Sequence, residues 1–504
     1  MSELKNIYEL FNLQVIRAPE KIAIIFNDCT KTYQEIYFEV DRLSAYLSRS
    51  GITKGDKIAV LLPNCTEFVI LMVVAAKMGI AIVPQNISHP TQTLAKQFSL
   101  LGVKYGVIWE DVLTDYQDQK QRQLFDFEWL AVSRDGFMYK KNNCSPFSIV
   151  NVSPDLPYIY TMTSGSTGDP KPIELLQITK IKRAKATVEM FGLSADDIIL
   201  AATPLYHSLA ERLVILPLIT GATSVIMAGF TAVEWLSHVE KYQVTFTMAV
   251  SSQLKQVYQL LQDGNDSNLS SLRCMVSSSE LLDDDLRKSL LVYFKNDFHE
   301  CYGASEVACI SGISAVDSKI KIGSVGRALP NVQLKIFKDD GIEAEINEIG
   351  EIACKTPLAF TGYYQKPELT QAAMHNGFFC TGDYGRLDKD GFLYFHGRKK
   401  DIIVTGGINV YPKDIENIIN THPDVLECAV IPLPDTNLGE KVTAIVVPKN
   451  DDLSIRNIQR LCAKNLADFQ QPREIIFVAA LLKNEMGKLV RKKLVEEYTN
   501  RVEL

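Results

Sequence analysis

The sequence predicts an α/β protein with a large N-terminal domain of parallel and mixed sheets covered by helices, a β-rich subdomain, and a small mobile α+β domain at the C-terminus. Three observations support this fold class. Strand-like and helix-like segments alternate up to about residue 320, alternating segments bounded by Gly and Asp follow, and the C-terminal part mixes both patterns. Apolar residues make up 46% of the chain and charged residues 22%, as in globular proteins with a substantial core.

The N-terminal strands are expected to be buried and parallel. Residues 57–62 (KIAVLL) form a continuous apolar run, residues 67–77 follow as a helix, and residues 80–84 form the next strand. Runs of this kind are typical of parallel strands that are covered on both faces. Further strands of the same type are expected at residues 198–200, 224–227 and 245–250.

The later segments read as antiparallel strands and as a separate small unit. Residues 332–336 and 391–395 alternate in character and are bounded by Gly and Asp, which indicates β-hairpins. The C-terminal unit is expected to join the rest near residues 398–401. It contains a helix at residues 412–420 and strands at residues 427–431 and 441–447.

Charge, cysteine usage and hydropathy exclude several classes of protein. The formal charge is −7, with no long basic tract, so nucleic acid is not an expected partner. The ten cysteines include no Cys-x-x-Cys pair, which argues against zinc and for a reducing, cytoplasmic location. The apolar stretch 68–76 ends at Lys77, far short of the about 20 residues of a membrane span, so no membrane span is expected.

The strongest chemical signal is the run from Tyr160 to Lys171 (YTMTSGSTGDPK). Glycines allow close approach of the backbone to a ligand, and backbone N–H groups with hydroxyls can surround phosphate oxygens. Lys171 adds a cation that a flexible linker would not need. The chain lacks the Gly-x4-Gly-Lys-Ser/Thr pattern of the common phosphate-binding loop.

This run resembles the phosphate-binding signature of the adenylate-forming superfamily, which includes acyl- and aryl-CoA synthetases, adenylation domains and luciferases. Other stretches match the superfamily in its order over nearly the whole chain. They are residues 204–207 (PLYH), 302–306 (YGASE), 323–327 (GSVGR), 381–383 (TGD), 397–401 (GRKKD), 406–412 (GGINVYP) and 487–488 (GK).

The resemblance implies a two-step reaction that uses ATP, Mg²⁺ and, with CoA synthetases as the model, coenzyme A. A carboxylic acid is first converted into an acyl adenylate with release of pyrophosphate, and a thiol then displaces AMP. The implied domains are residues 1–398 and a mobile lid, residues 399–504, with a hinge at Lys400. Gly406 and Gly407 match the strand-turn that lines the CoA tunnel of relatives.

The resemblance also implies the roles of individual residues. Lys488 bridges the carboxylate and the α-phosphate, Glu306 holds Mg²⁺, and Ser305 offers a hydroxyl to the phosphate. Tyr302 lies against adenine, while Asp383 and Arg398 contact the ribose. The complete set expected to contact ATP or AMP is Thr163, Ser164, Gly165, Ser166, Thr167, Gly168, Lys171, Ser278, Ser279, Tyr302, Gly303, Ala304, Asp383 and Arg398.

The acyl pocket is expected next to residues 207–209 (HSL), where amino-acid-specific relatives carry an aspartate. The absence of an aspartate at these residues favours a small carboxylic acid without an α-amino group as the substrate. Most of the neighbouring residues are small or apolar, which is compatible with an apolar acid. The expected pocket residues are His207, Met248, Val250, Ser277 and Cys309.

Three departures from the superfamily pattern concern the substrate and the acceptor more than adenylation. Pro172 replaces a usual glycine and removes an N–H group. The segment 277–282 (SSSELL) replaces a Gly-Ala-Pro-Leu element near adenine. The usual lysine before the C-terminal Val-Pro is replaced in 470–472 (QQP).

Two alternatives to CoA thioester formation remain open at this point. One is transfer of the acyl group to an amine or to a carrier protein. Such a carrier is expected to be a separate chain, because only 16 residues follow Lys488. The other is a catalytically silent nucleotide-binding protein. Retention of Lys488, Glu306 and Asp383 together argues against the silent protein.

Overall fold

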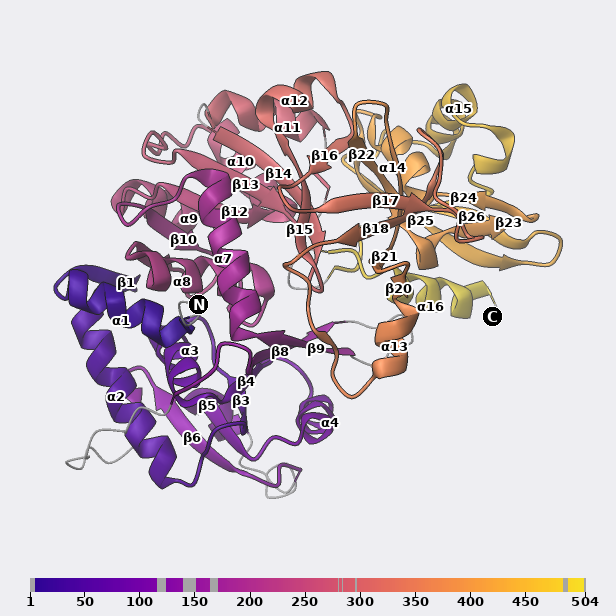
Figure 1. The fold of residues 1–504 in the computed structure, drawn as a ribbon. Coiled ribbons are helices and arrows are strands. Elements are labelled where there is room, and N and C mark those ends of the chain that lie inside the picture. The colour runs from indigo at the N-terminus through magenta and orange to yellow at the C-terminus, as the bar shows by residue number, and fades with distance from the viewer. Residues whose placement is uncertain are drawn as a thin grey trace. The chain divides into compact units, whose positions relative to one another are not determined.

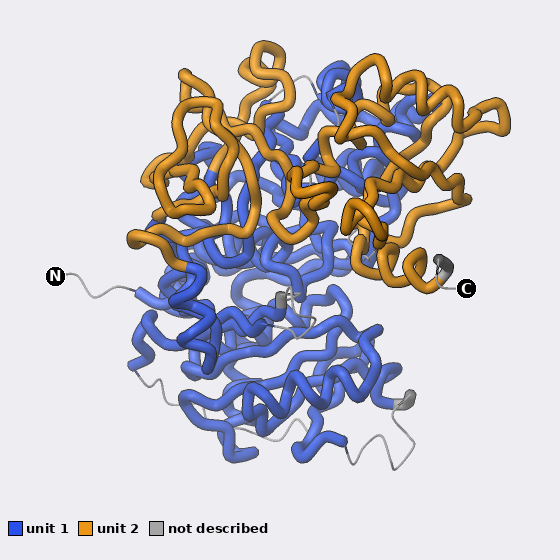
Figure 2. Tube along the Cα trace, turned by 90° about the vertical axis from the view of Figure 1, so that its right-hand side faces the viewer, with its two compact units in different colours: residues 1–310, 356–373 blue, residues 311–355, 374–504 orange. Residues whose placement is uncertain are grey.

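The structure is a computed structural model that describes residues 5–115, 124–138, 151–163, 171–279, 281–282, 284–294, 297–483 and 488–502. The chain forms two compact units, and Figure 2 colours them separately. Unit 1 contains residues 1–310 and 356–373, and unit 2 contains residues 311–355 and 374–504. The α/β fold class predicted from the sequence is confirmed. A functional boundary at residue 398 stays a prediction.

The first sheet of unit 1 is mainly parallel, as the continuous apolar runs predict (Figure 1). Its strands are β1 (Ile22–Phe26), β2 (Cys29–Thr32), β10 (Ile198–Ala201), β11 (Thr223–Ile226), β12 (Phe246–Val250), β13 (Cys274–Ser278) and β14 (Asp297–Ala304). They follow the order β2-β1-β11-β10-β12-β13-β14, in which β2 is antiparallel to β1 and the others run parallel.

The second sheet of unit 1 combines parallel strands with an antiparallel hairpin. Its strands are β3 (Lys57–Leu61), β4 (Ala81–Pro84), β5 (Tyr105–Trp109), β6 (Glu128–Ser133), β7 (Gly136–Phe137), β8 (Pro157–Thr163), β9 (Lys171–Leu176) and β19 (Gly362–Tyr363). The order is β19-β9-β8-β4-β3-β5-β6-β7. Strand β9 therefore lies between β8 and β19, and both of these pairings are antiparallel.

The helices of unit 1 cover these sheets. They are α1 (Ile7–Arg17), α2 (Tyr33–Arg49), α3 (Thr66–Met78), α4 (Thr91–Leu101), α5 (Glu110–Asp115), α7 (Gln177–Phe191), α8 (Ser208–Thr220), α9 (Ala232–Lys241), α10 (Ser251–Gln262), α11 (Asp284–Tyr293) and α13 (Pro367–Ala372). Helix α3 is the predicted core helix. It is buried from Phe68 to Met78 and packs against α1 and α2. Within the described part of the chain, none of the helices combines the length and hydropathy that a membrane span requires.

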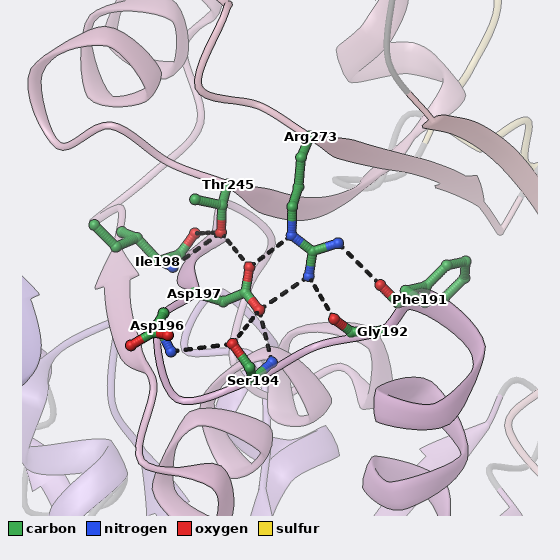
Figure 3. A network of polar contacts seen from close by, with 8 residues as sticks. All are labelled: Phe191, Gly192, Ser194, Asp196, Asp197, Ile198, Thr245 and Arg273. Atoms are coloured by element: carbon green, nitrogen blue, oxygen red, sulfur yellow. Dashed lines mark hydrogen bonds and ion pairs between the residues drawn. The ribbon is translucent and has the colours of Figure 1, made fainter.

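A polar network fixes the connection from α7 into β10 (Figure 3). The carboxylate of Asp197 accepts two hydrogen bonds from the guanidinium of Arg273, both at 2.9 Å. It also accepts one from the Thr245 hydroxyl and one from the Ser194 backbone N–H, each at 2.7 Å. Arg273 in turn donates to the carbonyl oxygens of Phe191 and Gly192, so the end of α7 is joined to the first sheet.

Unit 2 begins within β15 (Ala308–Ser314) and contains two sheets with their helices. The elements of its first part are α12 (Ala315–Ile320), β16 (Ser324–Ala328), β17 (Gln333–Phe337), β18 (Gly350–Lys355), β20 (Met374–His375), β21 (Phe378–Leu387) and β22 (Phe392–Arg398). Antiparallel pairing gives the order β17-β18-β21-β22-β16, with β20 beside β21. The two predicted hairpin strands, 332–336 and 391–395, correspond to β17 and β22.

The C-terminal part of unit 2 is a sheet with helices on both faces. Its elements are η1 (Lys399–Asp401), β23 (Ile403–Thr405), β24 (Ile408–Val410), α14 (Pro412–Asn420), β25 (Val425–Asp435), β26 (Gly439–Pro448), α15 (Ile455–Asn465), η2 (Asp468–Gln470), β27 (Glu474–Phe477) and α16 (Arg491–Val502). Along β25, Cys428 and Val430 pack with α14 and α15, whereas Ala429 and Ile431 pack with α16. This period of two places a core on each face of the sheet.

Candidate functional site

The expected phosphate loop connects β8 to β9. Of its residues, Ser164, Gly165, Ser166, Thr167 and Gly168 lie outside the described residues. The ends of the loop are described: Thr163 is the register partner of Lys171. The ammonium of Lys171 lies 5.4 Å from the centre of the Tyr363 ring. The paired ends of β8 and β9 therefore flank the expected loop, and Lys171 is the first described residue after it.

Pro172 does not interrupt the β8–β9 hairpin. Its carbonyl oxygen accepts a hydrogen bond of 2.9 Å from the backbone N–H of Tyr364. The N–H and C=O groups of one residue point to the same side of an antiparallel strand. The N–H that proline lacks would therefore point toward Tyr364 and away from β8. The substitution for the usual glycine leaves the hairpin ladder intact.

The end of β14 and the tight turn that leads from it to β15 are here together called the Tyr302–Glu306 turn; the strand end contributes Tyr302, Gly303 and Ala304, and the turn itself contributes Ser305 and Glu306. A Cβ atom on Gly303 would lie 1.9 Å from the Ala308 carbonyl oxygen, so only glycine fits there. This close approach lets the two strands turn within a few residues. The Ser305 and Glu306 side chains remain half-buried at the turn.

Glu306 is held through both its backbone and its side chain. Its carbonyl oxygen accepts hydrogen bonds from Nη2 of Arg183 at 2.9 Å and from the Phe360 N–H at 2.7 Å. Its Oε1 atom accepts a hydrogen bond of 3.0 Å from the Tyr363 hydroxyl. Among the described residues, Oε2 has no such donor. One oriented, half-buried carboxylate oxygen is therefore available to a cation.

The donor set around Glu306 fits Mg²⁺ bound together with phosphate groups. The described residues contain no group of three or more His, Cys, Asp or Glu side chains that could hold a metal by themselves. Mg²⁺ commonly binds through one or two carboxylates, water and substrate phosphates. A single oriented carboxylate is sufficient for that mode of binding.

The expected acyl-pocket residues differ widely in exposure. Met248 and Val250 on β12 are almost completely buried, and Met248 belongs to the core of unit 1. Ser277 is 1% exposed, and its hydroxyl has no partner among the described residues. His207 precedes α8 and Cys309 lies on β15, and both are half-buried. Pocket lining by this set stays a prediction.

Charged residues next to Cys309 are absent from the sequence-based set. Arg212 on α8 donates from Nη1 to the Cys309 sulfur at 3.4 Å, and Arg183 on α7 holds the Glu306 backbone. Both arginines are at least nine-tenths buried. Charged residues at buried positions of two helices are the signal that could have identified them, because Arg is rarely buried without a partner.

The two serines expected near adenine lie at the end of β13. The Ser278 hydroxyl donates to the Cys301 carbonyl oxygen at 3.2 Å. Ser279 has a φ of 80°, a left-handed conformation that is uncommon for residues other than glycine. The segment that replaces Gly-Ala-Pro-Leu therefore turns sharply directly after the strand.

In unit 2, Asp383 and Arg398 face each other on neighbouring strands. They are register partners on β21 and β22, and Nε of Arg398 lies 3.6 Å from Oδ1 of Asp383. Asp383 is buried, whereas Arg398 is exposed. The pair that resemblance assigned to the ribose therefore lies together within this unit.

Lys400 lies in the short helix η1 between two residues with ion-pair partners. Lys399 lies 3.1 Å from both Asp339 and Glu351. Asp401 lies 3.7 Å from Arg491. Lys400 itself is exposed. The expected hinge is therefore flanked by anchored neighbours.

Gly406 and Gly407 form the two-residue turn between β23 and β24. Their φ values are 57° and 80°. Positive φ at both central residues is what a type I′ hairpin turn requires. The turn alone therefore accounts for both glycines. A Cβ on Gly406 would meet Leu438 at an ordinary distance of 3.5 Å, and a Cβ on Gly407 would meet nothing within 4 Å.

Lys488 follows residues 484–487, which are outside the described part of the chain. The lysine is half-buried, and the next residue, Leu489, forms a β-bridge with Lys483. Gly487, its companion in the expected motif, is not described.

Comparison with known proteins gives consistent matches to both units. Residues 11–364 match the AMP-binding enzyme family, and residues 414–488 match the AMP-binding enzyme C-terminal domain. Indoleacetate–CoA ligase of Aromatoleum aromaticum is 30% identical over 496 residues, covering 96% of each chain. Long-chain-fatty-acid–CoA ligase FadD13 of Mycobacterium tuberculosis is 29% identical over 505 residues, covering 98% of this chain and 99% of the relative.

Solved structures of similar proteins include ligand complexes. The o-succinylbenzoate CoA synthetase of Bacillus subtilis, bound to its acyl-adenylate intermediate, has a TM-score of 0.87 and 26% identity, with 98% of each chain covered. The same synthetase in complex with ATP and magnesium ion has a TM-score of 0.86 and 26% identity, covering 96% of this chain and 98% of that one.

Proposed function

This chain belongs to the AMP-binding enzyme family, and from that premise we propose that it joins a carboxylic acid to coenzyme A in an AMP-forming reaction. In the first step a carboxylate oxygen of the acid attacks the α-phosphorus of ATP, and pyrophosphate leaves. In the second step the thiol of coenzyme A loses its proton and its sulfur attacks the acyl carbonyl carbon. A thioester forms and AMP leaves.

The observation that carries this proposal is the match over nearly the whole chain to CoA ligases, together with both family domains. The acids named for these relatives differ, so they leave the acid of this chain open. The scattered cysteines of the sequence support a reducing cytoplasm as its location.

In unit 1, the Tyr302–Glu306 turn and Lys171 are the groups proposed to handle Mg-ATP. Mg²⁺ held by Glu306 would neutralise phosphate charge when bound. The Tyr363 hydroxyl orients the Glu306 carboxylate, and Arg183 fixes its backbone. The Ser305 hydroxyl is proposed to donate to the phosphate.

In unit 2, Asp383 is proposed to accept hydrogen bonds from the ribose hydroxyls, with Arg398 beside it. Lys488 is proposed to place its ammonium between carboxylate and α-phosphate as negative charge concentrates there. A change of the backbone dihedral angles at Lys400 would then reorient residues 399–504 for the second step.

The test is mass spectrometry of products formed from Mg-ATP and a pool of carboxylic acids. One tube contains coenzyme A, and the other contains a pool of amino acids. A thioester formed only with coenzyme A supports the proposal and identifies the acid. An amide formed only with amino acids would replace it with an amide ligase. Release of pyrophosphate without either product would point to a carrier protein as the acceptor.

A further inference from the structure

Helices α7 and α8 bury a group of charges, and of these only Arg183 has a part in the proposed adenylation chemistry, through its contact with the Glu306 backbone. Lys180 and Arg183 come from α7, and Glu211 and Arg212 come from α8. All four residues, here called the basic cluster, are at most 9% exposed. Three positive groups against one negative group give the basic cluster a formal charge of +2.

The polar partners of the basic cluster leave donors unused. Lys180 forms an ion pair with Glu211. Arg183 donates from Nε to the Leu358 carbonyl at 3.0 Å and from Nη2 to Glu306, while its buried Nη1 has no partner among the described residues. Arg212 donates to the Cys309 sulfur, which is a weak acceptor. Neither arginine therefore has a carboxylate hydrogen-bonded to it within the described part of the chain.

An uncompensated buried charge is costly, because water is removed and no opposite charge replaces it. Burial lowers the pKa of Lys180, and the positive charges of Arg183 and Arg212 contribute to this shift. Glu211 and Glu306 interact electrostatically with Arg183, but the hydrogen bonds that their carboxylates accept come from Lys180 and Tyr363.

The basic cluster adjoins the residues proposed to bind the acid. Arg183 contacts the Glu306 backbone. Arg212 contacts Cys309, which is half-buried and follows Glu306 by three residues in the chain. Hydrogen bonding between Cys301 and Cys309 raises the pKa of Cys301 and lowers that of Cys309. The Cys309 sulfur is the weak acceptor that this thiol pair offers to Arg212.

Resting on the proposed function, we propose that the acid is a dicarboxylic acid: one carboxylate is adenylated, and Arg212, supported by Arg183, binds the other. A guanidinium matches a carboxylate through two parallel hydrogen bonds and stays charged when buried. A monocarboxylic acid would leave this charge uncompensated, and an α-ammonium group would be repelled. This substrate class differs from the apolar acid expected from the sequence, which took no account of Arg183 and Arg212.

The test compares matched pairs of acids, monocarboxylic and dicarboxylic, with four to eight carbons. Adenylation is followed by pyrophosphate release with Mg-ATP and hydroxylamine, so that no acceptor is needed. In the pair of acids with the highest activity, the wild-type kcat/KM is expected to be about 10-fold or more higher for the dicarboxylic acid. A ratio of this size corresponds to the free energy of a hydrogen bond to a charged group. Arg212→Met should remove this preference, mainly through the KM of the dicarboxylic acid.

Arg212→Lys should retain part of the preference, because it keeps the charge and loses the two-pronged geometry. Lys182→Met removes an exposed cation from α7 and should leave the preference unchanged. A general loss of folded enzyme would lower the rates of both acids together and leave their ratio unaltered. If Arg212→Met does not fold, the ratio measured for Arg212→Lys decides.

Two outcomes overturn the inference without touching the proposed function. One is that the wild type adenylates monocarboxylic acids as well as their dicarboxylic partners. The other is that folded Arg212 variants keep the wild-type ratio. In both cases acid-dependent pyrophosphate release still supports adenylation. If no acid of either class produces pyrophosphate, the proposed function itself fails.

Discussion

Replacing Asp197 with asparagine tests how strongly one polar network stabilises unit 1. The carboxylate accepts four hydrogen bonds of 2.7 to 2.9 Å from Arg273, Thr245 and Ser194. Asparagine has nearly the same shape, but its NH₂ group would face donors instead of accepting from them. The variant therefore loses the negative charge and places a donor against the donors that surround Asp197 (Figure 3).

The expected cost follows from the burial of the two partners. Removing one member of a fully buried ion pair costs about 3–5 kcal/mol, and exposed pairs contribute about 1 kcal/mol or less. Asp197 is 5% exposed and Arg273 is 38% exposed, so an intermediate loss of about 2–3 kcal/mol is expected for Asp197→Asn. At about 2 °C per kcal/mol for a large domain, the Tm of unit 1 should fall by about 4–6 °C in calorimetry at pH 7.

The neighbouring Asp196→Asn provides a matched control, because Asp196 is exposed and lies in the same turn. Its Tm should stay within about 1 °C of the wild type, as for most surface substitutions. A decrease of similar size in both variants would refute the assignment of stability to the Asp197 network. An unchanged Tm for Asp197→Asn would refute it as well.

The same comparison has a defined pH dependence. Burial alone would raise the pKa of Asp197, but the hydrogen bonds from Arg273, Thr245 and Ser194 lower it below its usual value. A carboxyl group with a lowered pKa in the folded state stabilises the protein above its unfolded-state pKa. That contribution disappears as the pH falls through the folded-state pKa. The Tm difference between wild type and Asp197→Asn should therefore be constant near neutrality and shrink below about pH 4.

Three further predictions concern the proposed reaction. Lys488→Ala should lower pyrophosphate release by about 10²–10³-fold, the usual effect of removing one preorganised electrostatic contact, and near-normal release would contradict the proposed role. Gly406→Asn, which tolerates the positive φ of the turn, should slow thioester formation while adenylate formation continues; equal loss of both steps would exclude a role in binding coenzyme A. Tyr363→Phe removes the hydrogen bond to Glu306 and should raise the Mg²⁺ concentration needed for half-maximal adenylation by about 10-fold, whereas Tyr364→Phe should not.

The elements that were predictable from the sequence are those with a uniform or a regularly periodic pattern of apolar residues. The run at 57–62 corresponds to β3, the run at 67–77 to α3, and the segment at 412–420 to α14. Each is either uniformly apolar or has a clear helical period, so a local pattern is sufficient. The family was also predictable, because its motifs keep their order in the chain.

The charged lining near Cys309 was not predictable in the same way. Arg183 and Arg212 are 29 residues apart in the sequence, and neither belongs to one of the motifs described above. Only the packing of α7 against α8 brings them toward Cys309. The expected set of small and apolar pocket residues therefore left out the two arginines that determine the charge near Cys309. Tertiary packing, and not local pattern, decides the electrostatics of such a site.

Pro172 and the Gly406–Gly407 turn show why residue type alone is weak support for function. Pro172 removes an N–H group next to the expected phosphate loop, yet the side of β9 on which it lacks that group is the side facing Tyr364. The two glycines matched a coenzyme A tunnel, yet a type I′ turn requires them whether or not a tunnel passes by. In both cases backbone geometry supplies a sufficient local reason. The acceptor must therefore be decided by the products, because Gly406 and Gly407 would be glycines in a thioester-forming or an amide-forming enzyme alike.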